Sequence, residues 1–502
     1  MKNPIPGKQE TGKRRRKMGT VFLVILAGLE IGFGVWTLIG QRELSAWRKG
    51  RLMIRGVQFG AVLSVFLLPA GNRGLRFSGV LLLLGIRLLI AGAGYLRKRK
   101  EAGIRGRVRS VLSTVAGCLL IVFFLIPAFI FSGYQGLKTT GGYEVKMVQV
   151  ILTDESRIET FESDGSCREV PIYMFYPVGK EVSDKNAAER KNGSEKGKND
   201  PAEGNFPLVI FSHGAFGYYQ SNTSTYMELA SHGYVVVSLD HPHHSFVTKD
   251  TSGKTITVDP QFIRNSMYLG SAEDGEVSEE EIFRTTREWI ELRVEDIGFV
   301  LDEIKEQAEA AKRGNFEADP DWYIKKASDV RLVGKGLACI DTGKIGVMGH
   351  SLGGAASVTI GRIRDDVNAV IDLDGTALGE ELSYENGMYR YYEGKYPAPL
   401  LMINSESHQA AMDRYGTDYV NMAVLANAED GRYTYFVGSG HMNFTDLPLF
   451  SPFLASKLGT GSIDAKKCIE TMNGIILQYF DHYLKDAGEL RICEKYSCSE
   501  EQ

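Results

Sequence analysis

Cysteine is scarce in this sequence, with six residues in 502, and none of them is spaced like a metal-binding cysteine motif. Cys118 lies inside a long apolar run, so five cysteines remain in the soluble part of the chain. An odd number cannot pair completely, and we expect at least one free thiol. Cys493 and Cys498 are the candidates for a disulfide in an oxidising compartment.

The chain also lacks an excess of basic residues. It has 58 Lys and Arg against 62 Asp and Glu, which gives a formal net charge of -4. Nucleic-acid binding requires a concentrated basic surface, so nucleic acid is excluded as the main partner. Basic residues cluster only in the first 110 positions, where they flank long apolar runs. That pattern is typical of a membrane protein.

Four apolar runs follow a basic tail at residues 1–18 and make up a predicted transmembrane region over 19–133. A membrane-spanning helix needs about 20 apolar residues, because each residue rises by about 1.5 Å across roughly 30 Å of hydrocarbon. The first run is too long for a signal peptide, and more such runs follow it. The second spans the membrane only if Arg55 snorkels to the interface. We expect four helices, or three if the second fails; they cover residues 19–40, 53–71, 78–96 and 110–131.

The loops between these helices predict an orientation. The first and third loops hold twelve Lys and Arg residues, against nine in the tail and the second loop. The positive-inside rule then places the first and third loops in the cytoplasm and the chain after residue 133 outside it. We therefore expect a multi-pass protein of the cell membrane. Glu30 and Arg87 lie within the spans, and we expect them to pair with each other or to lie at the interface.

From about residue 146 to residue 490 the pattern changes to that of an α/β domain. Short apolar strands alternate with helical stretches, which predicts a mostly parallel sheet covered by helices on both faces. The strands are expected at 170–177, 206–214, 233–241, 344–351, 369–375, 398–407 and 433–441. A polar stretch at 180–205 is expected to be a mobile loop. A long insertion at 249–340 contains a helical pattern that begins at Ser278, with Glu281 in position for a capping box.

The sequence GHSLGG at residues 349–354 follows the apolar run KIGVM and precedes a stretch of small residues. A strand, a tight Gly-x-Ser-x-Gly turn and a helix form the arrangement that exposes a nucleophilic serine at the end of a sheet. The glycines are needed because the serine has strained backbone angles and its neighbours approach closely. Ser351 is therefore the candidate nucleophile.

A serine hydroxyl needs a base, and the base needs a carboxylate that fixes its tautomer. His441 follows the strand YTYFVGSG and is the candidate base. Asp374 closes the strand AVIDLDG, 23 residues after Ser351, and is the candidate acid. Asp372 competes with it, but only residue 374 reaches the end of the strand.

Two N–H groups are required to hold the negative charge that develops on the substrate oxygen. Leu352 offers one at the start of the helix that follows the serine. The turn FSHGAFG, after an earlier strand, offers the second from Ala215. We interpret His213 in that turn as a structural residue.

These segments together resemble the plasma-type platelet-activating-factor acetylhydrolase family of α/β-hydrolases. FSHGAFG, LDHPHHS, GHSLGGA, DLDG, INSE and GSGHMNFTD occur in the order and approximate spacing of that family, over roughly residues 146–485. The resemblance implies an α/β-hydrolase fold, a triad of Ser351, Asp374 and His441, and oxyanion donors at Ala215 and Leu352. It also implies hydrolysis of short-acyl or oxidised-acyl esters, with no metal and no other cofactor.

The chain departs from the animal enzymes at DHPHHS, where His241, His243 and His244 form a cluster of imidazoles. Neighbours in one loop rarely converge on a zinc ion, so we expect a structural or substrate-side loop and no metal site. The predicted function is a membrane-anchored serine hydrolase that acts on an ester or lipid substrate. A general carboxylesterase, lipase or dienelactone-hydrolase-like enzyme is the alternative, and a hydrolase-like sensing module is the non-enzymatic one. The sequence leaves the oligomeric state open.

Overall fold

The computed structural model describes residues 9–40, 43–67, 75–97, 106–131, 136–179, 202, 204–271, 277–317 and 321–498. The chain divides into two compact units. One consists of residues 1–135 and 447–457, and the other of residues 136–446 and 458–502. The predicted loop at 180–205 lies almost entirely outside the described residues.

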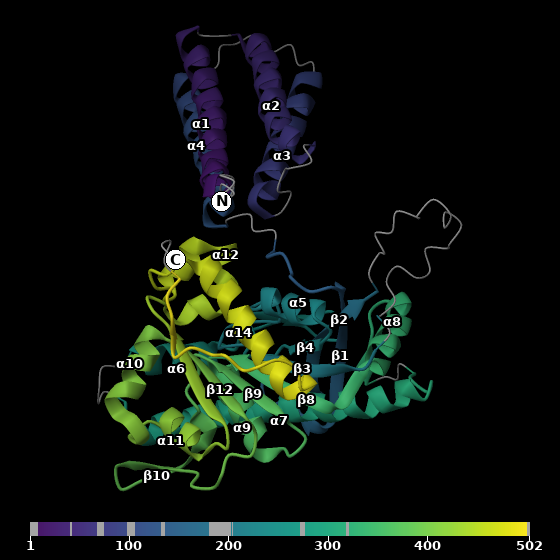
Figure 1. Ribbon diagram of the computed structural model, residues 1–502. Coiled ribbons are helices and arrows are strands. Elements are labelled where there is room, and N and C mark those ends of the chain that lie inside the picture. The colour runs from purple at the N-terminus through teal and green to yellow at the C-terminus, as the bar shows by residue number, and fades with distance from the viewer. Residues whose placement is uncertain are drawn as a thin grey trace, which may run out of the picture. The chain divides into compact units, whose positions relative to one another are not determined.

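The first unit is helical in its described part. Its long helices are α1 (Gln9–Ile39), α2 (Leu44–Leu67), α3 (Leu75–Leu96) and α4 (Arg107–Ile130), and two short helices, α12 (Leu447–Phe450) and α13 (Pro452–Lys457), complete it (Figure 1). Among the described residues, three stretches are long and apolar enough to cross a membrane, namely Gly19–Ile39, Arg76–Leu96 and Arg107–Ile130. The α2 helix is formed, but its first half is rich in Arg and Lys. In the described residues, three helices are therefore long and apolar enough to cross a membrane, which is the smaller of the two numbers expected from the sequence.

A buried ion-pair cluster joins three helices of this unit. Arg87 Nη2 lies 2.8 Å from Glu30 Oε1, which confirms the predicted pairing of these two residues. Arg55 does not snorkel; its side chain is 6% exposed and its guanidinium also binds the Glu30 carboxylate. Gln58 Nε2 donates to the same carboxylate at 3.2 Å. Because a charge in an apolar bundle is costly without a partner, this carboxylate ties α1, α2 and α3 together.

The second unit contains a ten-stranded sheet in the order β14-β13-β12-β9-β8-β3-β4-β2-β1-β7. From β4 to β14 the strands are parallel, whereas β1, β2 and β7 join antiparallel. The strand bounds are β1 (Glu144–Ile158), β2 (Cys167–Val178), β3 (Phe206–Ser212), β4 (Val235–Leu239), β7 (Trp322–Tyr323), β8 (Ile340–His350), β9 (Ala369–Leu373), β12 (Leu400–Ser405), β13 (Gly431–Phe436) and β14 (Lys495–Tyr496). All seven predicted strands are present, and the expected mostly parallel α/β sheet is confirmed.

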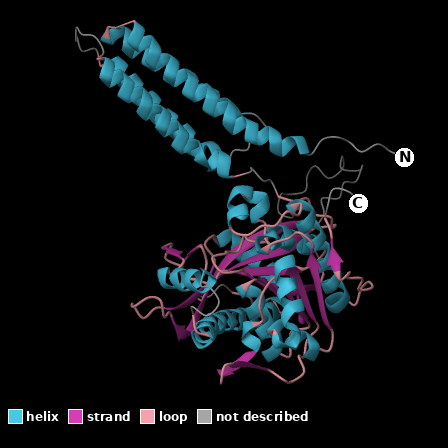
Figure 2. Cartoon of the chain, turned by 90° about the vertical axis from the view of Figure 1, so that its left-hand side faces the viewer, coloured by secondary structure: helices cyan, strands magenta, loops and turns pink. Residues whose placement is uncertain are grey.

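Helices cover both faces of this sheet, with strands between them in Figure 2. On one side α5 (Thr223–Ser231) and α14 (Ala465–Lys485) contact each other, and on the other side α7 (Glu279–Lys312) contacts α8 (Ala327–Ala338) and α9 (Leu352–Ile363). The alternation of side chains along β8 explains the two layers. Ile345 and Val347 belong to the core that includes α7, whereas Gly346 faces the other side, where an added Cβ would lie 2.6 Å from Phe480 of α14.

Smaller elements complete the second unit. They are α6 (Pro260–Ser271), α10 (Glu406–Tyr415), α11 (Val420–Asn427), the hairpins β5 (Val247–Lys249) with β6 (Thr255–Thr257) and β10 (Glu381–Glu385) with β11 (Met388–Tyr391), and the short helices η2 (Leu378–Glu380), η3 (Gly416–Asp418) and η4 (His441–Phe444). Ser278 caps α7 by accepting the Glu281 N–H at 3.2 Å, which is the serine half of the predicted capping box. Cys493 and Cys498 are both free thiols, so the candidate disulfide is not formed.

Candidate active site

Ser351 lies in the turn between β8 and α9, at the end of the sheet. Its backbone has a φ of 54° and a ψ of -123°, a strained conformation for a residue with a side chain. The flanking residues must be glycine, because the backbone around them leaves no space for a side chain. A Cβ on Gly349 would lie 2.3 Å from the Gly353 carbonyl, and one on Gly353 would lie 2.1 Å from the Ser212 carbonyl oxygen. The turn therefore has the geometry of a nucleophile elbow.

The turn after β3 passes against this elbow. A Cβ on Gly214 would lie 3.2 Å from the Ser351 Cβ, so the two chain segments are in contact. Among the described residues, neither the Ala215 N–H nor the Leu352 N–H donates a hydrogen bond. Two free N–H groups from two adjoining segments are what an oxyanion hole requires.

Asp374 and His441 lie together, as the sequence predicts. Asp374 follows β9, His441 opens η4 after β13, and His441 Nδ1 lies 2.7 Å from Asp374 Oδ2. Burial alone would raise the pKa of Asp374. Hydrogen bonds from His408 and His441 outweigh this effect and hold the pKa of Asp374 well below its usual range. The carboxylate is therefore charged wherever His441 would act as a base.

The serine and the histidine do not form a hydrogen bond in the described structure. The His441 side chain is 41% exposed, and its ring packs against His350 with the centroids 4.6 Å apart. Burial lowers the pKa of His350 to about 3, so this neighbour is neutral and adds no charge next to His441. Hydrogen bonds between nucleophile and base are often long before a substrate binds. Asp374 and His441 are therefore in place, and the hydrogen bond between His441 and Ser351 is the contact that has yet to form.

Asp372, the competing acid, has a different environment. It is fully buried, and its Oδ1 accepts the Gly375 N–H at 2.9 Å. A Cβ on Gly354 would lie 1.8 Å from the same oxygen, which places Asp372 directly beneath the elbow helix. Burial raises the pKa of Asp372 to about 7. The structure brings Asp374, and not Asp372, to His441.

A buried network behind the oxyanion turn was not predicted from the sequence. Arg293 of α7 donates to the His213 carbonyl oxygen and lies 3.5 Å from the Gly214 carbonyl oxygen. One turn further along α7, Asp296 accepts from Arg168 at 2.7 Å and contacts His241 Nδ1 at 2.9 Å. Burial lowers the pKa of Arg293 to about 9. The indication of this network in the sequence was that Arg293 and Asp296, three residues apart, lie within the apolar stripe of a predicted helix.

The predicted histidine cluster is divided among separate partners. His241 contacts Asp296 and Ser212. The other two rings stack on aromatic side chains instead, His243 on Phe161 and His244 on Phe262, at 4.6 and 3.9 Å. Among the described residues, no group of three potential ligands could hold a metal ion. His213 is buried and hydrogen-bonded to Ser245, which fits the structural role we expected.

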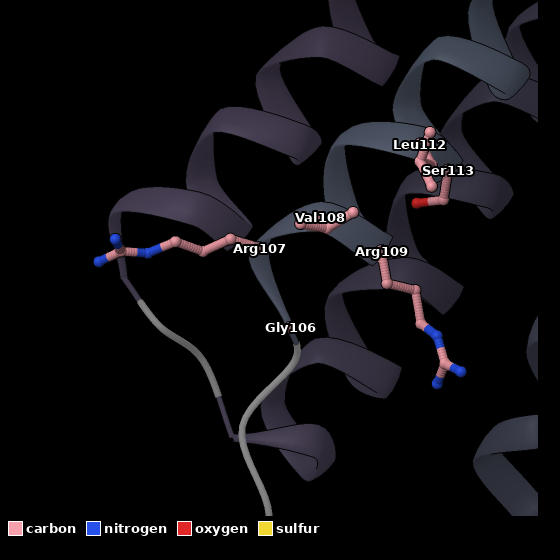
Figure 3. Close-up of a pocket in the computed structure, with 6 residues that line it drawn as sticks. All are labelled: Gly106, Arg107, Val108, Arg109, Leu112 and Ser113. Carbon is pink, nitrogen blue, oxygen red and sulfur yellow. The ribbon is translucent and has the colours of Figure 1, made fainter.

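A pocket also lies at the start of α4 (Figure 3). Six residues line it: Gly106, Arg107, Val108, Arg109, Leu112 and Ser113. The two arginine side chains point away from each other in the close-up. The lining has no histidine or carboxylate that could activate Ser113, so the candidate chemistry lies at Ser351.

Comparison with known proteins agrees with this geometry. A family profile described as "Platelet-activating factor acetylhydrolase, isoform II" matches residues 178–492. The platelet-activating factor acetylhydrolases of Gallus gallus and Bos taurus are 24% and 25% identical to this chain, and each alignment covers 56% of its length. A "Probable 1-alkyl-2-acetylglycerophosphocholine esterase" of Arthroderma benhamiae is 23% identical to this chain over 57% of its length. These alignments span 62%, 57% and 63% of the respective relatives, so the chain matches about three fifths of their length.

Among solved structures, the chain is similar to a ferulic acid esterase from Streptomyces cinnamoneus. The sequence identity is 19% and the TM-score is 0.45, with 70% of this chain and 93% of that chain covered. The family profile covers more than half of the 502 residues, including every predicted site residue. The chain belongs to the platelet-activating factor acetylhydrolase family.

Proposed function

We propose that this protein is a membrane-anchored serine hydrolase that cleaves short-acyl lipid esters through an acyl-enzyme. The observation that carries the proposal is the strained elbow at Ser351 beside the Asp374–His441 pair. A serine held in this conformation at the end of a sheet, with a buried charged acid on a nearby histidine, is costly to maintain without a reaction to serve.

The residues define a sequence of steps. His441 Nε2 accepts the Ser351 proton as the hydroxyl oxygen attacks the ester carbonyl, and Asp374 stabilises the resulting imidazolium. The tetrahedral oxyanion is held by the N–H groups of Ala215 and Leu352. His441 then gives its proton to the leaving alcohol. Water, deprotonated in turn by His441, attacks the acyl-enzyme and releases the carboxylic acid.

The surroundings of the oxyanion donors support a short acyl group. The side chains of Leu352 and Ala355 pack with Phe262 of α6 and Ile290 of α7, and Trp289 closes the same cluster. The rings of Phe262 and Trp289 are 4.9 Å apart. We infer that this aromatic packing next to the oxyanion donors limits the length of the acyl chain that can bind there. The names of the relatives, an acetylhydrolase and an acetylglycerophosphocholine esterase, favour the same class of substrate.

The apolar helices support membrane anchoring. Three helices of membrane length in one unit support a multi-pass protein, and from the distribution of basic loop residues we infer that the hydrolase domain lies outside the cytoplasm. A lipid ester could then reach the site by lateral diffusion. Addition of protease to intact cells tests the sidedness, because an extracytoplasmic domain is cleaved and a cytoplasmic one is protected.

The substrate is tested on the full-length protein in detergent. We expect acetate release from an acetylated ether phospholipid and a falling rate on nitrophenyl esters as the acyl chain grows beyond a few carbons. Ser351→Ala should abolish both activities without changing the circular dichroism spectrum. Equal or faster turnover of long-chain esters would indicate a lipase or general carboxylesterase instead. Full activity of Ser351→Ala would remove this serine from the mechanism.

A further inference from the structure

A second histidine, His408, contacts the candidate catalytic acid. It lies in the first turn of α10, directly after β12, where the Ser405 hydroxyl accepts the His408 N–H at 3.2 Å and caps the helix. This turn places His408 Nδ1 at 3.2 Å from Asp374 Oδ1. His441 contacts the other oxygen, Oδ2. The two oxygens of one carboxylate therefore each face a different histidine.

The far end of the His408 ring is also held. Its Nε2 lies 2.8 Å from the Tyr419 hydroxyl, which in turn lies 3.1 Å from Thr376 Oγ1. Asn421 Nδ2 approaches the same nitrogen at 3.5 Å. Because a charged carboxylate can only accept hydrogen bonds, Nδ1 must carry a proton, and this N–H donates a hydrogen bond to Asp374. The Tyr419 hydroxyl can donate to a neutral Nε2 or accept from a protonated one, so this contact is compatible with both charge states of His408.

The charges that face His408 are mostly negative. Asp374 and Asp372 approach from the end of β9, and among the described residues Tyr419, at the start of α11, is the remaining titratable group in contact. Burial lowers the pKa of His408, but the hydrogen bond to Asp374 and the charges of the two aspartates outweigh it, so the pKa of His408 is raised. A cationic His408 would neutralise part of the charge that Asp374 offers to His441.

We propose that His408 is a positioning residue of the triad: it fixes Asp374 through Oδ1 and, through its own protonation, sets how strongly Asp374 supports His441. This inference rests on the proposed hydrolase function. It predicts that His408 acts on the rate of the chemical step, and not on substrate binding, since no ligand has to touch it.

Two substitutions separate its hydrogen bond from its charge. His408→Asn places an amide N–H close to the position of Nδ1 but cannot titrate. His408→Phe removes the donor while keeping a ring of similar size. We expect the Phe variant to lower kcat by roughly tenfold with little change in KM, as for the loss of a hydrogen bond to a charged group. The Asn variant should recover kcat to within about threefold of the wild type. Equal losses in both variants, or no loss in either, would overturn the proposal.

The pH dependence gives a readout that a merely structural role would not change. As the pH falls, the wild type should lose activity in a step that reflects protonation of His408, whose pKa is raised. In His408→Asn this step should be absent, because an amide does not titrate. Superimposable profiles would contradict the proposal. His482→Asn, a substitution on α14 where the histidine contacts the Gly488 carbonyl oxygen, is the matched control and should leave the profile unchanged.

Proton NMR tests the contact without turnover. Histidine protons that are hydrogen-bonded to a carboxylate give resonances far downfield, and His241, bound to Asp296, should give one in every variant. Of the remaining downfield resonances of the wild type, we expect His408→Asn to remove one and Asp374→Asn to remove two. A downfield spectrum that His408→Asn leaves unchanged would overturn the inference. If the wild type is active and only the His408 results fail, the proposed function stands. If the wild type hydrolyses no ester, the proposed function fails while the spectrum still decides whether the two residues are linked.

Discussion

Replacing Asp374 with Asn removes one charge and adds one donor, and the structure determines which way the amide will turn. Oδ1 accepts the Ser405 N–H at 2.6 Å and faces His408, whereas Oδ2 has His441 as its one hydrogen-bond partner in the described part of the chain. The amide oxygen should therefore occupy the Oδ1 position, where two donors meet it. The new NH₂ group then points at His441 Nδ1. A donor at that position forces His441 into the tautomer with its proton on Nε2, which cannot accept the Ser351 proton.

We expect a loss in kcat of about three to four orders of magnitude, because the wrong tautomer removes the general base. At about 1.4 kcal/mol for each factor of ten, this is about 4 to 5.5 kcal/mol of lost transition-state stabilisation. Asp372→Asn serves as the matched control. Its Oδ1 can still accept the Gly375 N–H, so kcat should fall by less than about tenfold, within what a single hydrogen bond contributes. Steady-state hydrolysis of a nitrophenyl acetate by both variants, with thermal unfolding measured alongside, makes the comparison. The reverse ranking would move the acid to Asp372 and refute the reasoning.

Four further predictions concern positioning, stability, the pH dependence of stability, and metals. Arg293→Met should lower kcat by about tenfold to a hundredfold, because the His213 carbonyl loses the donor that orients the oxyanion turn. An unchanged kcat with a lowered Tm would show that Arg293 contributes to stability and not to catalysis. Glu30→Gln should destabilise the helical unit by about 3 kcal/mol in detergent unfolding, since the buried Arg55 and the partly buried Arg87 lose their counter-charge. Asp372→Asn should raise Tm at pH 8 more than at pH 5. The folded-state pKa of about 7 lies above the unfolded one, so the penalty for burying this carboxylate is present above pH 7 and fades as the pH falls. Activity should survive prolonged EDTA treatment, and loss restored by zinc would contradict a metal-free mechanism.

The parts of the site that could be predicted are those set by local sequence. A strand, a glycine-flanked serine and a run of small residues determine the elbow at Ser351 within about ten consecutive positions. Asp374 could be preferred to Asp372 because it stands where its strand ends. The structure agrees, since β9 stops at Leu373 and Asp374 turns away with a φ of 54°. These inferences needed only the direction of the chain and the end of each strand.

The residues that sequence reasoning missed depend on contacts between distant segments. Arg293 reaches a carbonyl 80 positions away, and His408 reaches a carboxylate 34 positions away. Nothing in their immediate neighbours predicts these partners, because the register of α7 and α10 on the sheet decides them. Arg55 is a similar case. Its own helix suggested a side chain that escapes to the interface, but the partner Glu30 lies on α1.

Covalent labelling of Ser351 tests the central claim most directly. A fluorophosphonate probe reacts only with a serine that has a working base and oxyanion hole, so it reports the assembled site without knowledge of the substrate. The full-length protein in detergent would be labelled, digested and analysed by peptide mass spectrometry, with His441→Ala as the control. We predict an adduct on Ser351 in the wild type and none in His441→Ala. A folded wild-type protein that remains unlabelled, or an adduct on another serine, would contradict the account.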